Sequence, residues 1–166
     1  MRRTSLSESI CPIARSLDEI GDWWTILIVR DAFHGKRRFV EFRESLGLAR
    51  NILSSRLRTL IAHGILEKRV GDTRHCEYHL TEKGRQLRVV LTAIRQWGEE
   101  NLFAEGDLMM VAHDRLRRPI ARLRLTDQEG RPLEPEAIGI TQGRKRTASG
   151  RPTTDRPRPS PGVRSR

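Results

Sequence analysis

Long apolar runs are missing from this chain of 166 residues. A helix that crosses a membrane needs about 18 or more consecutive apolar residues, and no stretch approaches that length. A secretory signal is also not indicated, because charged residues such as Glu8 and Arg15 follow closely behind Arg3. We therefore expect a soluble protein of the cytoplasm without a membrane partner.

Cysteines and catalytic patterns are scarce as well. Cys11 and Cys76 are the two cysteines, and without an export signal we expect both to be reduced thiols. No nucleophile has a base at usable spacing, no glycine-rich phosphate loop occurs, and acidic residues are scattered singly along predicted helices. The sequence therefore does not indicate an enzyme, and we expect no cofactor.

One short segment contains residue types that bind metals, namely His75, Cys76 and His79. The segment is predicted to be a strand, in which positions 75 and 79 face one side and position 76 faces the other. A metal ion needs ligands that converge. We therefore expect no metal site.

The positive charge is concentrated at the C-terminal end. Residues 142–166 contain eight Lys and Arg against Asp155 alone, so +7 of the net +11 lies there. Four prolines and hardly any apolar residue predict that this tail is disordered. Such a tail attracts DNA without sequence preference, or it is a solubilising extension, and composition does not choose between the two.

Four helices are predicted in the first part of the chain by apolar residues at helical spacing. The first starts near Pro12, a residue favoured in a first helical turn, and stops at Gly21. Asp22 caps the second helix. The third is short and ends at Gly47, and the fourth spans roughly residues 50–63.

The fourth helix has one apolar stripe, formed by Leu53, Leu57, Leu60 and Ile61. A turn of about 100° per residue places the remaining side chains on the other side of the helix. Those opposite the stripe are Asn51, Ser55, Arg58, Thr59 and Ala62, with Ser54 and Arg56 on the flanks. This outward face is short, polar and positive.

Two strands follow, over residues 65–70 and 75–80, joined by a turn through Gly71, Asp72, Thr73 and Arg74. A helix about 12 Å across fits the major groove of B-DNA, and a short basic hairpin can reach the adjoining minor groove. The predicted fold is therefore mainly α with a small β-wing (α+β), a winged helix-turn-helix that binds double-stranded DNA.

A fifth helix is predicted after Thr81, a good N-cap. It has more apolar residues on one face than a single winged domain needs, namely Leu87, Val90, Leu91, Ile94 and Trp97. We infer that this face meets the first helix of a second chain, so that the N- and C-terminal helices form a homodimer. The alternative is that the helix folds back onto its own domain.

Six short motifs occur in a fixed order: Cys11-Pro12; Gly21 with Trp24-Thr25; Arg38-Phe39; Leu53-Ser54 with Arg56-Leu57; Gly64-Ile65-Leu66; and Tyr78-x-Leu80-Thr81-x-x-Gly84. By these motifs, residues 10–98 resemble the HxlR-type family of bacterial winged helix-turn-helix transcriptional regulators, within the MarR-like superfamily. The resemblance implies a dimer built from the terminal helices, operator binding near a promoter, and regulation, usually repression, of a neighbouring gene.

The chain departs from that family in three places. Ala49 stands where the family commonly has a serine that caps the recognition helix, which weakens the helix start by about 1 kcal/mol. The wing turn is short, and an extension follows Gly106. We accordingly expect an N-terminal arm (1–9), a winged domain (10–105), an extension with a short hairpin (106–141) and the basic tail (142–166).

We expect the outward face of the fourth helix to contact DNA bases. Arginine pairs with guanine and asparagine with adenine, each worth about 1–3 kcal/mol of discrimination. The residues expected at bases are Asn51, Ser54, Ser55 and Arg58, and those expected at phosphates are Lys36, Arg37, Arg38 and Arg56. Arg74 is expected to contact DNA from the wing tip.

Cys11 precedes Pro12 at a helix N-terminus, where the helix dipole favours a thiolate, and Arg15 lies one turn further on. The family resemblance implies a role for this cysteine in sensing oxidants or electrophiles, and a structural N-cap thiol is the alternative. Trp23, Trp24 and Trp97 either line a pocket for an aromatic effector between the dimer helices or pack in the core.

These patterns together predict a sequence-specific transcriptional regulator, with repression the expected mode. It would bind a pseudo-palindromic operator as a homodimer in the nucleoid and respond to an oxidant or a small-molecule effector. The alternative is a non-specific architectural DNA-binding protein driven by the basic tail.

Overall fold

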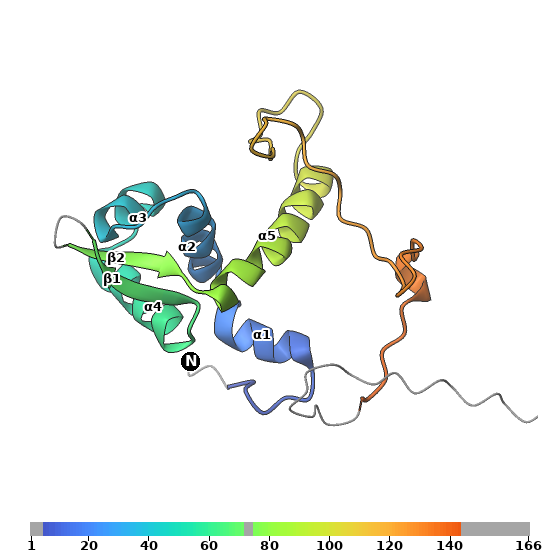
Figure 1. Cartoon of the computed structure of the whole chain (residues 1–166), viewed down its shortest axis with the longest axis horizontal. Coiled ribbons are helices and arrows are strands. Elements are labelled where there is room, and N and C mark those ends of the chain that lie inside the picture. Colours follow the sequence, from blue (N-terminus) through green and yellow to red (C-terminus); the bar gives the residue numbers. More distant parts are fainter. Residues whose placement is uncertain (1–4, 72–74, 144–166) are drawn as a thin grey trace, which may run out of the picture. The chain divides into compact units, whose positions relative to one another are not determined.

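A computed structural model describes residues 5–71 and 75–143. These residues form five α-helices, one two-stranded antiparallel sheet and a short 3-10 turn (Figure 1). The elements are α1 (Pro12–Ile20), α2 (Trp23–Phe33), α3 (Phe39–Leu46), α4 (Arg50–Ala62), β1 (Leu66–Val70), β2 (Cys76–Leu80), α5 (Glu82–Asn101) and η1 (Pro135–Ala137). The chain divides into two compact units, 1–123 and 124–166. The first unit contains the winged helix-turn-helix.

The core lies where α2, α3 and α4 meet the hairpin. Leu53, Leu57 and Leu60 are buried, as the apolar stripe of the fourth helix predicts, and Ile61 is half-buried beside them. Phe42 of α3 meets Tyr78 of β2 edge-on, with ring centroids 6.3 Å apart. The hairpin is therefore packed against the helix-turn-helix.

Local sequence signals explain where the helices begin and end. The Thr25 amide donates to Asp22 Oδ1 at 3.2 Å, which caps α2. The Gly84 amide donates to Thr81 Oγ1 at 3.0 Å, which caps α5. Gly47 ends α3 with φ of 62°, a left-handed conformation that favours glycine. Ala49 begins α4 without a side-chain cap.

The wing is regular as far as the structure describes it. Leu66 pairs with Leu80 and Val70 with Cys76, so each strand starts one residue later than predicted. The turn residues 72–74, and with them the prediction for Arg74, lie outside the described residues.

No group of three metal-ligand side chains converges among the described residues. His79 instead lies with its Nε2 atom 2.9 Å from Glu77 Oε2. No helix in the described ranges is long and apolar enough to cross a membrane.

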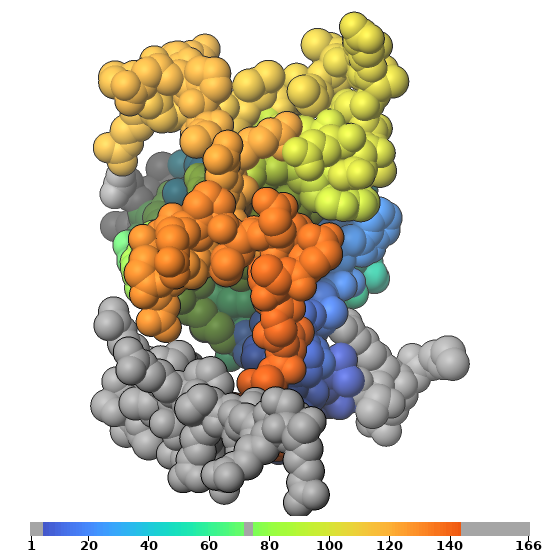
Figure 2. Space-filling view, turned by 90° about the vertical axis from the view of Figure 1, so that its right-hand side faces the viewer, coloured from blue at the N-terminus to red at the C-terminus, as the bar shows by residue number. Residues whose placement is uncertain are grey.

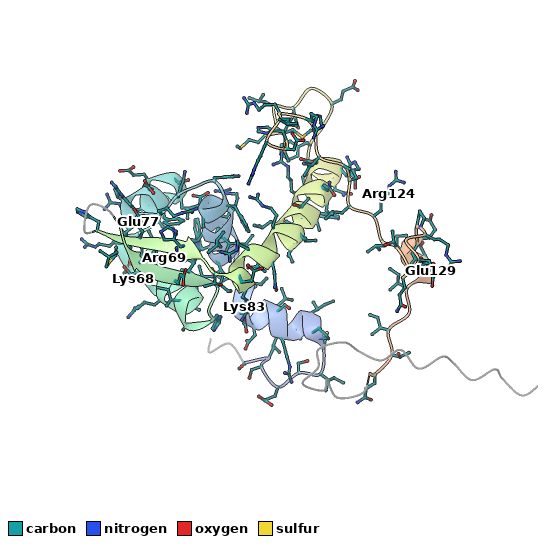
Figure 3. The ribbon with its side chains drawn as sticks, viewed as in Figure 1. Lys68, Arg69, Glu77, Lys83, Arg124 and Glu129 are labelled. Atoms are coloured by element: carbon teal, nitrogen blue, oxygen red, sulfur yellow. The ribbon has the colours of Figure 1, made fainter. Side chains whose placement is uncertain are left out.

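Helix α5 is attached to the end of α4 and to α1. The Thr81 amide donates to the Ile65 carbonyl at 3.1 Å. Lys83 lies at the start of α5 (Figure 3), where its Nζ atom is 2.6 Å from Glu19 of α1 and 2.9 Å from the carbonyl of His63. These contacts join three helices at one point.

The segment that follows α5 turns back beside the C-terminal end of that helix (Figures 1 and 2). Gln96 binds it twice, since its amide nitrogen donates to the Ala121 carbonyl at 3.2 Å and its oxygen accepts from the Leu123 amide at 2.9 Å. Arg122 also pairs with Glu100. Residues 106–123 therefore belong to the same compact unit as the winged domain.

Within the residues that are described, the remainder of the extension has no regular strand, but Thr126 and Pro132 form an isolated antiparallel bridge across a tight turn. At the turn of residues 127–130, Asp127 Oδ1 accepts from the amides of Glu129 (3.0 Å) and Arg131 (2.8 Å). Asp114 makes the same kind of turn in the first unit, accepting from the Leu116 and Arg118 amides. Residues 144–166, which include nearly all of the predicted basic tail, lie outside the described residues.

Candidate DNA-binding surface

The outward face of α4 places the four residues expected at DNA bases on one side of one helix. Asn51, Ser55 and Arg58 are exposed, and Ser54 is half-buried. Residues three and four apart share a helix face, so the four side chains form one continuous strip. Their amide, hydroxyl and guanidinium groups suit hydrogen bonding to base edges.

Lys68 of β1 adds a positive charge that the sequence interpretation missed. It is exposed and, together with Arg58 and Ser54, lines a shallow depression of about 210 Å³ beside Tyr78. Its Nζ atom lies 6.0 Å from the centroid of the Tyr78 ring, and Figure 3 shows it on the hairpin. Residues two apart in a strand share a face, so Lys68 lies on the same face of β1 as buried Leu66. This alternation in the sequence could have identified Lys68 as a residue beside α4.

The basic turn before α3 is held by an acidic residue. Glu41 Oε2 accepts hydrogen bonds from the amides of Arg37 (2.7 Å) and Arg38 (2.8 Å). These two bonds hold the pKa of Glu41 below its ordinary value. The Arg37 guanidinium donates to the carbonyl of Ala32 at 2.6 Å, whereas the Arg38 side chain is exposed.

The same turn is joined to the wing. The Tyr78 amide donates to the Arg37 carbonyl at 2.8 Å, and Arg38 forms an isolated antiparallel bridge with Glu77. The positions of the basic turn and of the wing are therefore coupled through the backbone. Lys36, which opens the turn, is half-buried.

Arg56 is engaged inside the domain. Its Nη2 atom lies 2.9 Å from Asp22 Oδ2, and its Nε atom is buried. This geometry joins α4 to the start of α2. It differs from that of Arg58, whose side chain is exposed on the strip.

Cys11 occupies the N-cap position of α1, and its thiol is exposed and free. The nearby Arg15 guanidinium donates to the carbonyl of Ser9. Cys76 is likewise exposed and free. Both thiols are open to solvent reagents.

The three tryptophans differ in their burial within this single chain. Trp24 packs partly buried against the core, whereas Trp23 is 67% exposed and Trp97 is 59% exposed. The rings of Trp23 and Trp24 are tilted, with centroids 4.5 Å apart.

An apolar surface lies on α1 and α5 within the first unit. On α1 and just before it, Ile10, Ile13 and Leu17 are exposed. On α5 the exposed apolar residues are Val89, Val90, Ile94 and Trp97. Both helices therefore carry exposed large apolar residues, a feature that marks interfaces between proteins where such residues gather into a patch.

Comparison with known proteins agrees with this geometry. Residues 19–105, slightly more than half of the chain, match the model of the HxlR-like helix-turn-helix family. The uncharacterised HTH-type transcriptional regulator Mb3122 of Mycobacterium bovis is 42% identical over 92 residues, 54% of this chain and 58% of that protein. The chain thus spans less than two thirds of the length of this curated relative.

Solved structures show the same fold. The crystal structure of PA1607, a candidate transcription factor, has a TM-score of 0.80 and 46% identity, and covers 84% of this chain and 99% of that one. The redox regulator HypR in its reduced form has a TM-score of 0.51 and 35% identity, covering 55% of this chain and 93% of that one. The similarity to PA1607 therefore extends beyond the region that matches the family model.

Proposed function

This chain belongs to the HxlR-like helix-turn-helix family, and we propose that it recognises a specific pseudo-palindromic operator as a homodimer and represses the gene beside it. The family and the relatives support the general role, which is that of a transcriptional regulator with a helix-turn-helix DNA-binding domain. Recognition of a specific operator rests on one observation, the exposed polar strip of Asn51, Ser55 and Arg58 on α4.

In the proposed complex the strip enters the major groove. Arg58 pairs with guanine and Asn51 with adenine, while Ser54 and Ser55 contact neighbouring base edges or phosphates. Lys68 joins them from the wing. Such contacts determine which sequence is bound.

Phosphate contacts come from the basic turn. Lys36 and Arg38 orient the domain on the duplex without choosing a sequence. Arg37 and Arg56 were expected in the same role. Their contacts with Ala32 and Asp22 favour a structural contribution, so we propose that they support the surface from within.

Gel shifts on specific and random duplexes test the proposal. We expect Arg58→Ala to lose operator preference, by about 1–3 kcal/mol of discrimination, while Lys36→Ala weakens binding to all duplexes alike. Arg115→Ala, which removes an exposed arginine after α5, is the matched control and should bind as the wild type does. Equal losses on both duplexes for Arg58→Ala would refute the role of the strip.

The salt dependence of binding gives a second measure. With Lys36 and Arg38 as the phosphate contacts of each chain, a dimer releases counterions from roughly 4 phosphates, so log K against log salt should fall with a slope of about −4. Lys36→Ala should reduce that slope by about 2 per dimer, because one contact is lost in each subunit.

The apolar surface of α1 and α5 supports the homodimer. Burying Ile13, Val90 and Trp97 against a second copy would remove them from water. Trp97→Glu should shift the protein to monomer in sedimentation velocity. Val70→Glu, which changes an apolar residue on the wing that is even more exposed than Trp97, should leave the dimer intact. A monomeric wild-type protein would overturn this part of the proposal.

The exposed thiol of Cys11 supports a response to oxidants, and HypR, a similar protein, is a redox regulator. Diamide should change operator affinity in the wild type and in Cys76→Ser, but not in Cys11→Ser. If Cys11→Ser responds to diamide as the wild type does, Cys11 is not the sensor, and the alternative of a structural N-cap thiol stands.

A non-specific architectural role remains the second candidate, because +7 of net charge lies in residues 142–166. The ratio of specific to random affinity discriminates between the two roles. If α4 reads sequence, removing residues 142–166 lowers affinity for all DNA and keeps the preference. We place the protein in the cytoplasm, on the nucleoid.

A further inference from the structure

A groove of about 510 Å³ lies between α2, α5 and residues 110–120. Its apolar walls come from all three segments, with Ile26 on α2, Leu91 and Ile94 on α5, and Ile120 on the segment after α5. Small-molecule sites occupy roughly 300–1,000 Å³ and are mostly apolar with few polar groups. The groove fits that description, and none of the three tryptophans lines it.

Three arginines stand at the groove, and one of them lacks a carboxylate partner. Arg30 is 2.9 Å from Asp31, and Arg95 is 2.6 Å from Glu99. Arg88 forms no ion pair with any described residue, and its guanidinium lies 4.0 Å from the centroid of the Phe33 ring. The ring holds this charge at the groove without neutralising it.

The local electrostatics are positive. Partial burial, with the charges of Arg30, Arg88 and Lys36, holds the pKa of His34 below its ordinary value, against the opposing effect of Asp31. His34 also lines the groove. A bound anion would meet the uncompensated charge of Arg88 beside an apolar wall.

We propose that this groove binds an amphipathic organic anion, whose carboxylate pairs with Arg88 and whose apolar body lies on Leu91, Ile94 and Ile120. This inference rests on the proposed function, because such a ligand would be an effector of the regulator. Helix α2 leads into the helix-turn-helix and α5 starts directly behind the wing. A ligand between them therefore contacts both the DNA-binding half and the α5 half of the winged unit.

Calorimetric titration of the full chain with 4-phenylbutyrate tests the inference. We expect saturable binding of 4-phenylbutyrate, and binding about 10- to 100-fold weaker for 4-phenylbutan-1-ol, which has the same apolar body without the charge. Butyrate, which lacks the ring, should also bind more weakly. Equal affinity for the acid and the alcohol would overturn the role of Arg88, and lack of saturable binding would overturn the site.

Two variants with a matched control complete the test. Arg88→Gln removes the cation, and Ile120→Glu adds a negative charge to the wall that the segment after α5 forms. Each should weaken 4-phenylbutyrate binding about tenfold or more. Arg115→Gln changes an exposed arginine that does not line the groove and should bind as the wild type does. Circular dichroism verifies folding, and wild-type affinity in a folded Arg88→Gln protein contradicts the proposal.

The titration contains no DNA, so its outcome is independent of the gel shifts. If the protein binds the ligand but shows no operator preference, the proposed function is refuted and the proposed anion site stands. If it shows operator preference but does not bind the ligand, the anion site is refuted and the proposed function stands. If both hold, adding 4-phenylbutyrate to the gel shift should change operator affinity in the wild type and not in Arg88→Gln.

Discussion

Arg56 of α4 pairs with Asp22, the N-cap of α2, at an Nη2–Oδ2 distance of 2.9 Å. The second oxygen of the same carboxylate accepts the Thr25 amide. One side chain thus defines the start of α2 and holds the flank of α4. Through these two contacts Asp22 helps to hold the exposed strip of α4 in place relative to α2.

Two substitutions at Asp22 separate its two contacts. Asp22→Asn keeps a cap acceptor and loses the ion pair, which is partly exposed, so we expect a loss of up to about 1 kcal/mol in the free energy of unfolding. Asp22→Ala loses the cap as well and should cost about 1 kcal/mol more. Urea denaturation measures both. Equal stabilities for the two variants would show that the cap contributes nothing.

Glycine is required at position 84 and replaceable at position 98, although both positions lie in α5. A Cβ atom at Gly84 would be 2.2 Å from the Ile65 carbonyl, so Gly84→Ala should destabilise the protein by about 1–3 kcal/mol. A Cβ atom at Gly98 would meet only Leu102 Cδ1 at 3.9 Å, so Gly98→Ala should stabilise it by about 0.5–1 kcal/mol. Opposite shifts in thermal unfolding are expected, and shifts of the same sign would contradict the contact at Ile65.

Glu41 should make stability depend on pH in the acid range. Its pKa is lowered in the folded state by the amides of Arg37 and Arg38, so the folded state favours the carboxylate. That contribution is fully present above the ordinary glutamate pKa and is lost as pH falls through the lowered value. Glu41→Gln should therefore be less stable than the wild type near neutral pH, by about 1 kcal/mol, as is typical of a helix cap. This difference in the free energy of unfolding should vanish in strong acid, where Glu41 is protonated. A difference that stays constant across pH would show that ionisation of Glu41 does not contribute to stability.

Much of the fold could be predicted because its signals are local. Apolar spacing located five helices, and Asp22, Gly47 and Thr81 marked three of their ends with the contacts that the structure shows. The exposed strip on α4 also followed from periodicity alone, because Leu53, Leu57 and Leu60 determine which side of the helix is buried.

The supporting contacts could not be predicted in the same way, because they join residues distant in sequence. Arg56 was expected at phosphates, yet its place on the flank of α4 brings it to Asp22, more than thirty positions earlier. Lys68 lies beside Arg58 because the hairpin packs against α4. The groove at Arg88 depends on residues 110–120 returning to α5, for which the sequence showed no pattern.

The order of residues alone determined which elements form and which helix face is polar, since hydrogen bonding and apolar periodicity act over a few neighbouring positions. Tertiary structure decided which of the described arginines pair with a carboxylate, as Arg56 does, and which do not, as with Arg88. It also decided why Gly84 has no side chain and where an anion can meet an uncompensated charge. Those properties arise only when distant segments pack together, because charge pairing and steric contact depend on distance in space and not on separation along the chain.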